Sequence, residues 1–271
     1  MTIKSVETIL EPNPGNDYCE DVLGYVDNLF WVIDGATGLY SERIYEDYRT
    51  DAEALANYLS EGIILNKSNG NLKDILGGSI EYSMSKTIQD LKDYRLGPSA
   101  SVILARINLK DIEVFRLGDA EIYYDQTGYH DFCLSHQNLD KNTLMLISQL
   151  KSDSENYKES RLELIRNARN KMNTPNGYWV ATPDGLGLEH GKYETFLNLG
   201  GNIYLWSDGF GCLFNNYQYN LGYVDGKGLN EVGRLIRDIE GADPRLEKYS
   251  RFKQHDDMAA IKIGIEGKEH G

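Results

Sequence analysis

Two aspartates would face each other at the end of a short hairpin near the start of the chain. If Asp27 and Asn28 form a two-residue turn, the flanking apolar segments pair as antiparallel strands with Asp21 opposite Asp34. Directly opposed side chains in such a pair have Cβ atoms roughly 4.5–5.5 Å apart. Two carboxylates this close repel each other unless a cation lies nearby. The pairing therefore favours a cation-binding site.

Two further aspartates also stand at the ends of predicted strands. Asp208 follows residues 203–207, and Asp256 precedes residues 258–265. A single aspartate at such a place is explained by a turn or a cap, but four together favour a metal centre. Oxygen ligands without Cys or His select Mg²⁺ or Mn²⁺ over zinc, and we interpret the adjoining His255 as a surface residue. Two such cations close together can bind a phosphoryl oxygen and lower the pKa of a bridging water, so the pattern predicts hydrolysis of a phosphate ester.

The elements that must position these carboxylates come in blocks. Strands are expected at residues 5–10, 21–26, 29–34, 100–107, 112–117, 121–125, 177–182, 203–207 and 258–265, with the three between 100 and 125 forming a meander, and helices at 47–66, 71–92, 138–172 and 229–239. Blocks of strands and paired helices, rather than strict β-α-β alternation, favour antiparallel sheets with helices packed outside. No internal repeat or long linker divides the chain, so we predict one domain, residues 1–271.

The composition is typical of a soluble globular protein with an acidic balance. The net charge of −14 repels a polyanionic phosphate backbone, which argues against a nucleic-acid partner. The three cysteines are widely separated and form no CxxC pair, so neither a disulfide framework nor a thiolate zinc site is expected, and a reducing cytoplasm fits best. No apolar run approaches the roughly 20 residues that span a bilayer, so we expect no membrane association.

Six segments resemble, in order and spacing, the motifs of the protein phosphatase 2C family, the metal-dependent protein phosphatases. They are NDYCED (16–21), VIDGATG (32–38), GPSASVILARI (97–107), FRLGDAEIYY (115–124), LWSDGFG (205–211) and HDDMAAIKI (255–263). Each motif alone is common, but together they cover nearly the whole chain in the family's order. The resemblance implies an α+β fold of four layers, α-β-β-α, in which two antiparallel sheets are flanked by helical pairs and hold a two-metal site at one end.

The resemblance also assigns metal ligands. Asp34 would bridge the two cations, and Gly35 would offer its backbone carbonyl. Asp208 and Asp256 would complete one metal site. We therefore expect two Mn²⁺ or Mg²⁺ ions, held by oxygen ligands.

The family's acidic pair corresponds to Glu20 and Asp21. One of them would bind the second metal through water, and the other would orient bound water. Asp21 and Asp34 are therefore the residues expected to carry catalysis. Asp93 stands about where many members place an aspartate for a third, weaker metal, and it is a candidate ligand. Asp119 matches the family's Gly-Asp turn and is interpreted as structural.

Three positions depart from the family's pattern. The phosphate-binding arginine that often precedes the acidic pair has no counterpart in residues 11–21, and Glu121 stands where an arginine commonly follows the Gly-Asp-Ser turn. Ala36 occupies the position of a histidine that, in animal members, is thought to protonate the departing oxygen. Residues 174–190 resemble bacterial members more than animal ones. The first two departures concern substrate binding, and the third concerns protonation of the leaving group.

We predict a metal-dependent serine/threonine protein phosphatase of a bacterial cytoplasm, acting as a monomer on phosphoproteins. A pseudophosphatase that keeps the fold as a binding module is the alternative favoured by the missing arginine, whereas the complete carboxylate set favours an active enzyme. A small-nucleotide phosphohydrolase is the second alternative, because two-metal carboxylate sites also serve phosphodiester chemistry. The acidic charge argues against a polynucleotide substrate.

Overall fold

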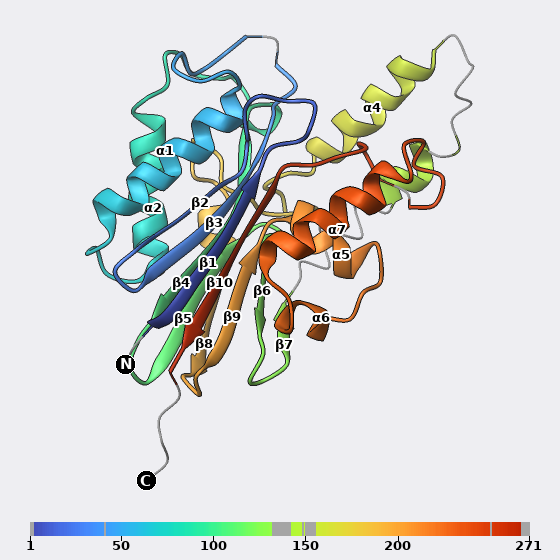
Figure 1. Ribbon diagram of the computed structural model, residues 1–271. Coiled ribbons are helices and arrows are strands. Elements are labelled where there is room, and N and C mark those ends of the chain that lie inside the picture. The colour runs from blue at the N-terminus through green and yellow to red at the C-terminus, as the bar shows by residue number, and fades with distance from the viewer. Residues whose placement is uncertain are drawn as a thin grey trace.

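The computed structural model describes residues 3–40, 42–131, 142–147, 149, 156–249 and 251–266 and shows two packed five-stranded antiparallel sheets (Figure 1). The first, here the β10 sheet, has the order β1-β10-β9-β6-β7, and the second, the β3 sheet, has the order β2-β3-β4-β5-β8. The β10 sheet is built from β1 (Ile3–Glu11), β6 (Glu121–Tyr124), β7 (Tyr129–Asp131), β9 (Gly201–Trp206) and β10 (Met258–Ile265). The β3 sheet is built from β2 (Val22–Val26), β3 (Leu29–Ala36), β4 (Ser99–Ile107), β5 (Asp111–Leu117) and β8 (Lys192–Leu197).

Helices cover the outer face of each sheet (Figure 1). The β3 sheet is covered by α1 (Asp51–Asn66) and α2 (Leu72–Met84), and the β10 sheet by α5 (Asp208–Asn215), α6 (Gly222–Asp225) and α7 (Leu229–Gly241). The remaining helical elements are α4 (Tyr157–Arg169), η1 (Tyr94–Leu96) and η2 (Leu188–His190). The predicted α+β class, with two antiparallel sheets flanked by helices, is confirmed.

Strand β3 is apolar along most of its length because both of its faces are buried. Phe30 and Val32 lie between the sheets, in a cluster with residues of β4, β6, β9 and β10. Trp31 and Ile33 belong to the cluster that packs against α1 and α2. Burial on both faces explains why this strand reads as a continuous apolar run instead of an alternating one. The run carries Asp34, which follows it directly, into the interior.

The hairpin register predicted from the sequence is confirmed. β2 and β3 pair from Val22 with Ile33 to Val26 with Leu29. In the turn between them, Asp27 has a φ of 56°. One further step along this ladder brings the two predicted aspartates opposite each other.

The predicted meander was wrong. β5 pairs with β8, whereas β6 leaves this sheet and lies between β7 and β9 in the other one. The chain changes direction at Gly118, whose φ of 106° is a conformation that glycine adopts without strain. β6 therefore brings residues after this turn into the β10 sheet.

The predicted strand at 177–182 was also wrong. This segment makes only isolated bridges, Ala100 with Ala181 and Met172 with Tyr178. Strand β4 is already paired with β3 on one side, and from Val102 onward with β5 on the other. Residues 177–182 can therefore pair only with the part of β4 before Val102, which is too short for a regular strand pairing.

The helices differ from prediction mainly at their ends. α1 begins at Asp51 because Thr50 caps it by accepting a hydrogen bond from the N–H of Glu53. α2 begins with a capping box formed by Asn71 and Asp74, and it ends at Met84, short of the predicted end. Of the predicted helix 138–172, residues 142–147 and α4 are helical, while 138–141, 148 and 150–155 lie outside the described residues. The elements that were not predicted are the helices α5 and α6, the short helical turns η1 and η2, and the strands β7 and β8.

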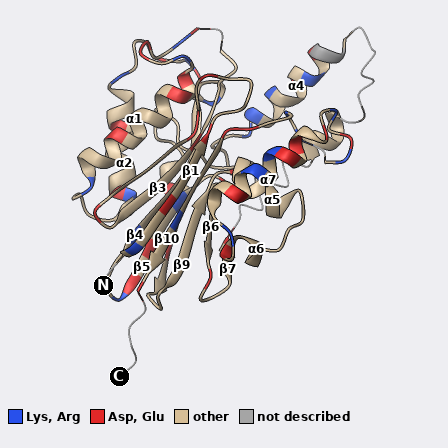
Figure 2. Ribbon diagram, in the orientation of Figure 1, with Lys and Arg blue, Asp and Glu red and all other residues tan. Residues whose placement is uncertain are grey.

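Charged side chains of both signs are distributed over the surface elements. Figure 2 shows acidic and basic residues interspersed along α7. In the described part of the chain, no helix is long and apolar enough to cross a membrane.

Candidate functional site

The predicted carboxylates gather at one end of the two sheets. Asp34 lies near the end of β3, Asp21 directly precedes β2, Asp208 begins α5, and Asp256 stands ahead of β10. Burial raises the pKa of Asp34 well above its usual range, and it is raised further by the charges of Asp208, Asp21, Asp119 and Asp256. These side chains are therefore close enough to repel one another. We call Asp21, Asp34, Asp119, Asp208 and Asp256 the carboxylate cluster.

Asp21 is the least exposed member of this cluster. The residue is 3% exposed, and its Oδ2 atom has no hydrogen-bond partner among the described residues. Burial raises the pKa of Asp21, a hydrogen bond from Ser207 opposes the rise, and the charges of Asp256 and Asp208 add to it. A buried carboxylate oxygen without a partner is costly until a proton or a cation satisfies it. This oxygen is therefore suited to a bound cation.

Gly35 permits a close approach by the loop that carries the acidic pair. Its N–H donates to the carbonyl oxygen of Glu20 at 3.2 Å. A Cβ atom here would lie 2.4 Å from that oxygen and 3.0 Å from the carbonyl oxygen of Ala52, so only glycine fits. The Glu20 carboxylate also accepts a hydrogen bond from the hydroxyl of Thr37. The end of β3 and the loop before β2 are thereby tied together just beyond Asp34.

Asp257 fixes the same loop from the other sheet. Its carboxylate accepts hydrogen bonds from the backbone N–H of Asn13 at 2.6 Å and of Glu20 at 2.7 Å. These two contacts use both carboxylate oxygens, which makes Asp257 a positioning residue. Sequence reasoning gave it no role of its own, because its partners lie 244 and 237 positions away.

Gly209 lets α5 begin against the segment that leads into β10. A Cβ atom at this position would lie 1.9 Å from the carbonyl oxygen of Asp257 and 3.2 Å from the Cβ of Asp256. No side chain fits in that space. The spacing between Asp208 and Asp256 therefore depends on this glycine.

Gly209→Ala should lower the free energy of unfolding by about 1–3 kcal/mol, the usual cost of overpacking. It should also weaken Mn²⁺ binding, because α5 must move away from Asp256. Gly241→Ala is the matched control, since an added Cβ there meets nothing within 4 Å and alanine is the better helix former. Urea denaturation and a Mn²⁺ titration measure the two effects. Equal stability and equal Mn²⁺ binding in both variants would contradict the close approach.

Glu121 has a structural role. The residue is 2% exposed. Its carboxylate accepts hydrogen bonds from Trp206 Nε1 at 2.9 Å and Asn215 Nδ2 at 2.6 Å, and it lies 2.7 Å from His130 Nε2. The contacts join β6, β7, β9 and α5. The residue that stands in place of the family's arginine thus supports the helix that begins with Asp208.

Asp93, the predicted ligand of a third metal, makes local contacts. Its Oδ1 accepts a hydrogen bond from the N–H of Arg95 at 3.0 Å, and its Oδ2 lies 2.7 Å from Arg95 Nη2. Hydrogen bonding by Arg95 lowers the pKa of Asp93. Both carboxylate oxygens are thus in use, and the third-metal assignment stays a prediction.

Asp119 belongs to the carboxylate cluster, although its motif suggested only a turn. Its charge raises the pKa of Asp34. Ser101 donates a hydrogen bond to Asp119, and Ser101 pairs with Asp34 across β3 and β4. A signal was available in the sequence, because counting the register from β3 through β4 to β5 brings Asp119 to the same end of the sheet.

Arg169 reaches the cluster's surroundings from the end of α4. It donates to the carbonyl oxygen of Thr37 at 2.5 Å and to Ser99 Oγ at 3.0 Å. Burial lowers the pKa of Arg169. Sequence reasoning did not connect this arginine with the centre. Its donors tie α4 to the ends of β3 and β4, so it positions these segments.

Lys253 contacts the carboxylate cluster directly. Its Nζ atom lies 2.5 Å from Asp256 Oδ1. Burial and the charge of Asp208 raise the pKa of Asp256 to about 7, and the ion pair with Lys253 opposes the rise. The sequence analysis missed this residue, since a lysine in a loop carries no motif.

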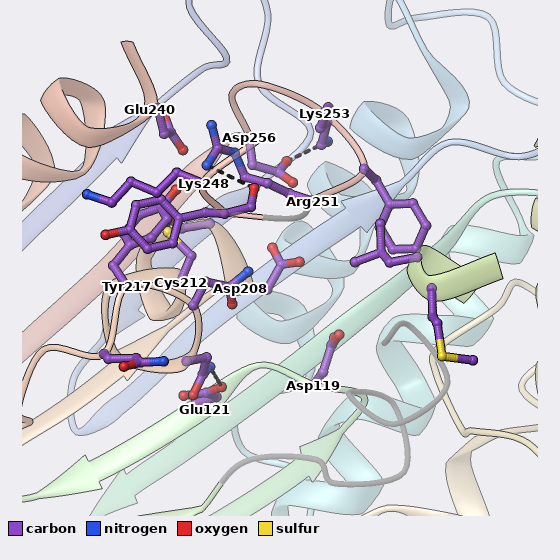
Figure 3. Close-up of a pocket in the computed structure, with 18 residues that line it drawn as sticks. Asp119, Glu121, Asp208, Cys212, Tyr217, Glu240, Lys248, Arg251, Lys253 and Asp256 are labelled. Carbon is purple, nitrogen blue, oxygen red and sulfur yellow. Dashed lines mark hydrogen bonds and ion pairs between the residues drawn. The ribbon is translucent and has the colours of Figure 1, made fainter. Parts of the chain in front are cut away.

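A cavity of about 610 Å³ opens beside the cluster (Figure 3). Asp208 lies between Asp256 and Asp119 in this view. Part of the wall comes from the end of α5 and from the loop between α7 and β10, and it carries the aromatic and cationic side chains Tyr217, Tyr249, Lys248 and Arg251. The cavity thus joins the carboxylate cluster to a wall of mixed aromatic and charged side chains.

The chemistry of the cluster fits a hard divalent cation. Within the residues that the structure describes, no three His, Cys, Asp or Glu side chains are grouped as a ready-made metal site. The donors are nevertheless carboxylate oxygens, one of them on Asp21 buried without a described partner. Their mutual effects on pKa reflect repulsion that a cation would relieve. The metal site itself stays a prediction.

Comparison with known proteins identifies the fold. No profile of a protein family and no curated protein sequence matches the chain. Among solved structures, the serine/threonine phosphatase Stp1 from Staphylococcus aureus is similar over 98% of this chain and 96% of its own, at 14% identity and a TM-score of 0.57. The PPM Ser-Thr phosphatase MsPP from Mycobacterium smegmatis, in complex with cacodylate, covers 98% of this chain and 100% of its own at 12% identity and a TM-score of 0.53.

The catalytic domain of the serine/threonine protein phosphatase PstP, in complex with two manganese ions, is also similar. It matches 96% of this chain and 97% of its own at 10% identity, with a TM-score of 0.52. The chain therefore has the fold of the PPM serine/threonine phosphatases, as the motif resemblance implied.

Proposed function

We propose that this chain is a metal-dependent phosphatase of the PPM type that hydrolyses phosphoserine or phosphothreonine in proteins. The observation that carries the proposal is the carboxylate cluster, in which Asp21 has a buried oxygen without a partner among the described residues. Such a cluster is costly in a protein that binds no cation. The fold shared with Stp1 and PstP supports the same function.

The proposed site uses oxygen donors from several strand ends. Two Mn²⁺ or Mg²⁺ ions there would neutralise charge on the phosphoryl group and activate water for attack. The donors that would hold these ions, directly or through water, are Glu20, Asp21, Asp34, the carbonyl of Gly35, Asp208 and Asp256, with Asp119 as a further candidate. Asp257 holds the loop of the acidic pair in place. A cytoplasmic location and a monomeric state stay predictions.

A pseudophosphatase is the second candidate, because Lys253 already pairs with one oxygen of Asp256. A chain that had replaced a metal by an ammonium group could keep the fold and lose turnover. The ion pair does not satisfy Asp21, however, whose Oδ2 is buried without a partner in the described structure. This oxygen favours a bound cation over a chain in which Lys253 has replaced the metal.

Adding Mn²⁺ should raise the melting temperature and start turnover of p-nitrophenyl phosphate and of a phosphoserine peptide. A ligand at 100 times its Kd stabilises the native state by about 2.7 kcal/mol, which corresponds to roughly 5–10 °C for a chain of this size. EDTA should reverse both effects. Stabilisation without phosphate release would indicate the pseudophosphatase, and an unchanged melting temperature would contradict the metal centre.

A further inference from the structure

Lys253 is placed so that its ammonium group acts on the carboxylate cluster. It lies in the loop between α7 and β10, and its Nζ atom is 2.5 Å from Oδ1 of Asp256, three residues further on (Figure 3). Its side chain is 51% exposed. The ammonium group can therefore leave this contact without unpacking the protein.

The positive charge of Lys253 interacts with other carboxylates besides that of Asp256. Burial opposes its charged form, but the charges of Asp256, Asp208 and Asp34 outweigh burial and raise the pKa of Lys253. Three proposed metal ligands thus act on one ammonium group. Without metal, this lysine supplies part of the positive charge that the cluster requires.

The other basic side chains on the wall of the cavity have different contacts. Arg251 pairs with Asp243, Nη1 to Oδ2, at 3.3 Å. The Nζ atom of Lys248 lies 4.9 Å from the centre of the Tyr249 ring. Lys253 is thus the basic residue of this wall, as far as the structure describes it, that pairs with a proposed metal ligand.

We propose that Lys253 is a tethered cation: a divalent metal displaces it from Asp256, and its ammonium group then binds the phosphate of the substrate. The inference rests on the proposed function and names the residue that compensates for the missing arginine. A doubly charged ion attracts a carboxylate more strongly than one ammonium charge does. The released group stays in the cavity, because its backbone is only three residues from Asp256. Lysine can bind phosphate as a point charge on a flexible stem.

Lys253→Gln should change metal binding and phosphate binding in opposite directions. Without the competing ammonium group, half-saturation should need roughly 2- to 5-fold less Mn²⁺, measured by melting without substrate. Without the phosphate contact, inorganic phosphate should inhibit p-nitrophenyl phosphate hydrolysis with a Ki about 2- to 5-fold higher, and KM should rise more than kcat falls. A residue that only stabilised its loop would not shift these constants in opposite directions.

Two variants serve as controls. Lys253→Arg keeps the positive charge, so its Mn²⁺ midpoint should lie closer to the wild-type value than that of Lys253→Gln. Lys248→Gln removes the same charge from the same loop without breaking a contact to the cluster, so both constants should stay near their wild-type values. Equal Mn²⁺ midpoints in Lys253→Gln and Lys248→Gln would overturn the inference, as would unchanged phosphate inhibition in Lys253→Gln.

Amine labelling of the wild-type protein tests the inference even if the variants do not fold. Mn²⁺ should increase modification of Lys253 by an amine-reactive reagent, relative to Lys248, and inorganic phosphate added with Mn²⁺ should reduce it again. Mass spectrometry measures both. If Mn²⁺ does not change the labelling of Lys253, the inference is overturned and the proposed function is not. A wild-type protein that neither binds Mn²⁺ nor releases phosphate would overturn the proposed function.

Discussion

Asp34→Asn should reduce Mn²⁺-dependent turnover by at least about a thousandfold while the fold stays intact. Metal-ion catalysis supplies several kcal/mol of transition-state stabilisation, and each 1.36 kcal/mol is a factor of ten in rate. Asparagine keeps the shape of the side chain but removes the charge expected to bridge two cations. The charges of Asp208 and Asp21 act against ionised Asp34, so the metal-free variant should be at least as stable as the wild type.

Turnover, circular dichroism and thermal melting of Asp34→Asn give these quantities. Asp238→Asn is the matched control, because this aspartate is exposed on α7 and should be dispensable for turnover. Asp208→Asn and Asp256→Asn should behave like Asp34→Asn. Near-normal activity in Asp34→Asn would remove the basis for the ligand assignment.

Aryl phosphates should be hydrolysed about 10²–10⁴-fold faster than phosphoserine peptides, which is the usual contribution of a positioned general acid. Ala36 ends β3, and its methyl group cannot donate a proton to the leaving oxygen. A phenolate leaves readily without protonation, whereas a serine alkoxide does not. The rate should therefore depend steeply on the pKa of the leaving group.

Rates across a series of substituted phenyl phosphates measure this dependence. Introducing a general acid by Ala36→His should flatten it. His255 Nδ1 lies 2.8 Å from Glu240 Oε2, and loss of phosphoserine turnover in His255→Ala would identify this histidine as the substitute acid. A wild-type slope near zero, where chemistry limits the rate, would refute the argument.

The hairpin shows how much of the site the sequence could predict. A two-residue turn fixes the register of its two strands, so the pairing of Val22 with Ile33, and with it the position of Asp34, follows from counting. Asp208 and Asp256 also stand at strand ends, but no local rule brings their strands to the same end of the protein. For these two residues, the order of the family motifs supplied what counting could not.

The rest of the site depends on contacts across the whole chain. Lys253 meets Asp256 because of the path of an irregular loop, and Asp257 meets the amide of Glu20 across two sheets. Glu121 satisfies donors from three other elements. None of these contacts has a periodic signal, and β6 changes sheets after Gly118 for a reason that spacing does not reveal.

The position of β10 within its sheet determines when the sheet can be completed during synthesis. This strand follows every other described strand in the sequence, yet it lies inside its sheet, between β1 and β9. Until β10 has been synthesised, β1 and β9 lack the strand that joins them, and the contact between Asp257 and the loop of Glu20 cannot form. Asp21 and Asp34 are therefore synthesised well before Asp208 and Asp256, which complete the carboxylate cluster. A nascent chain can therefore contain most of its helices and strands before the proposed site is complete.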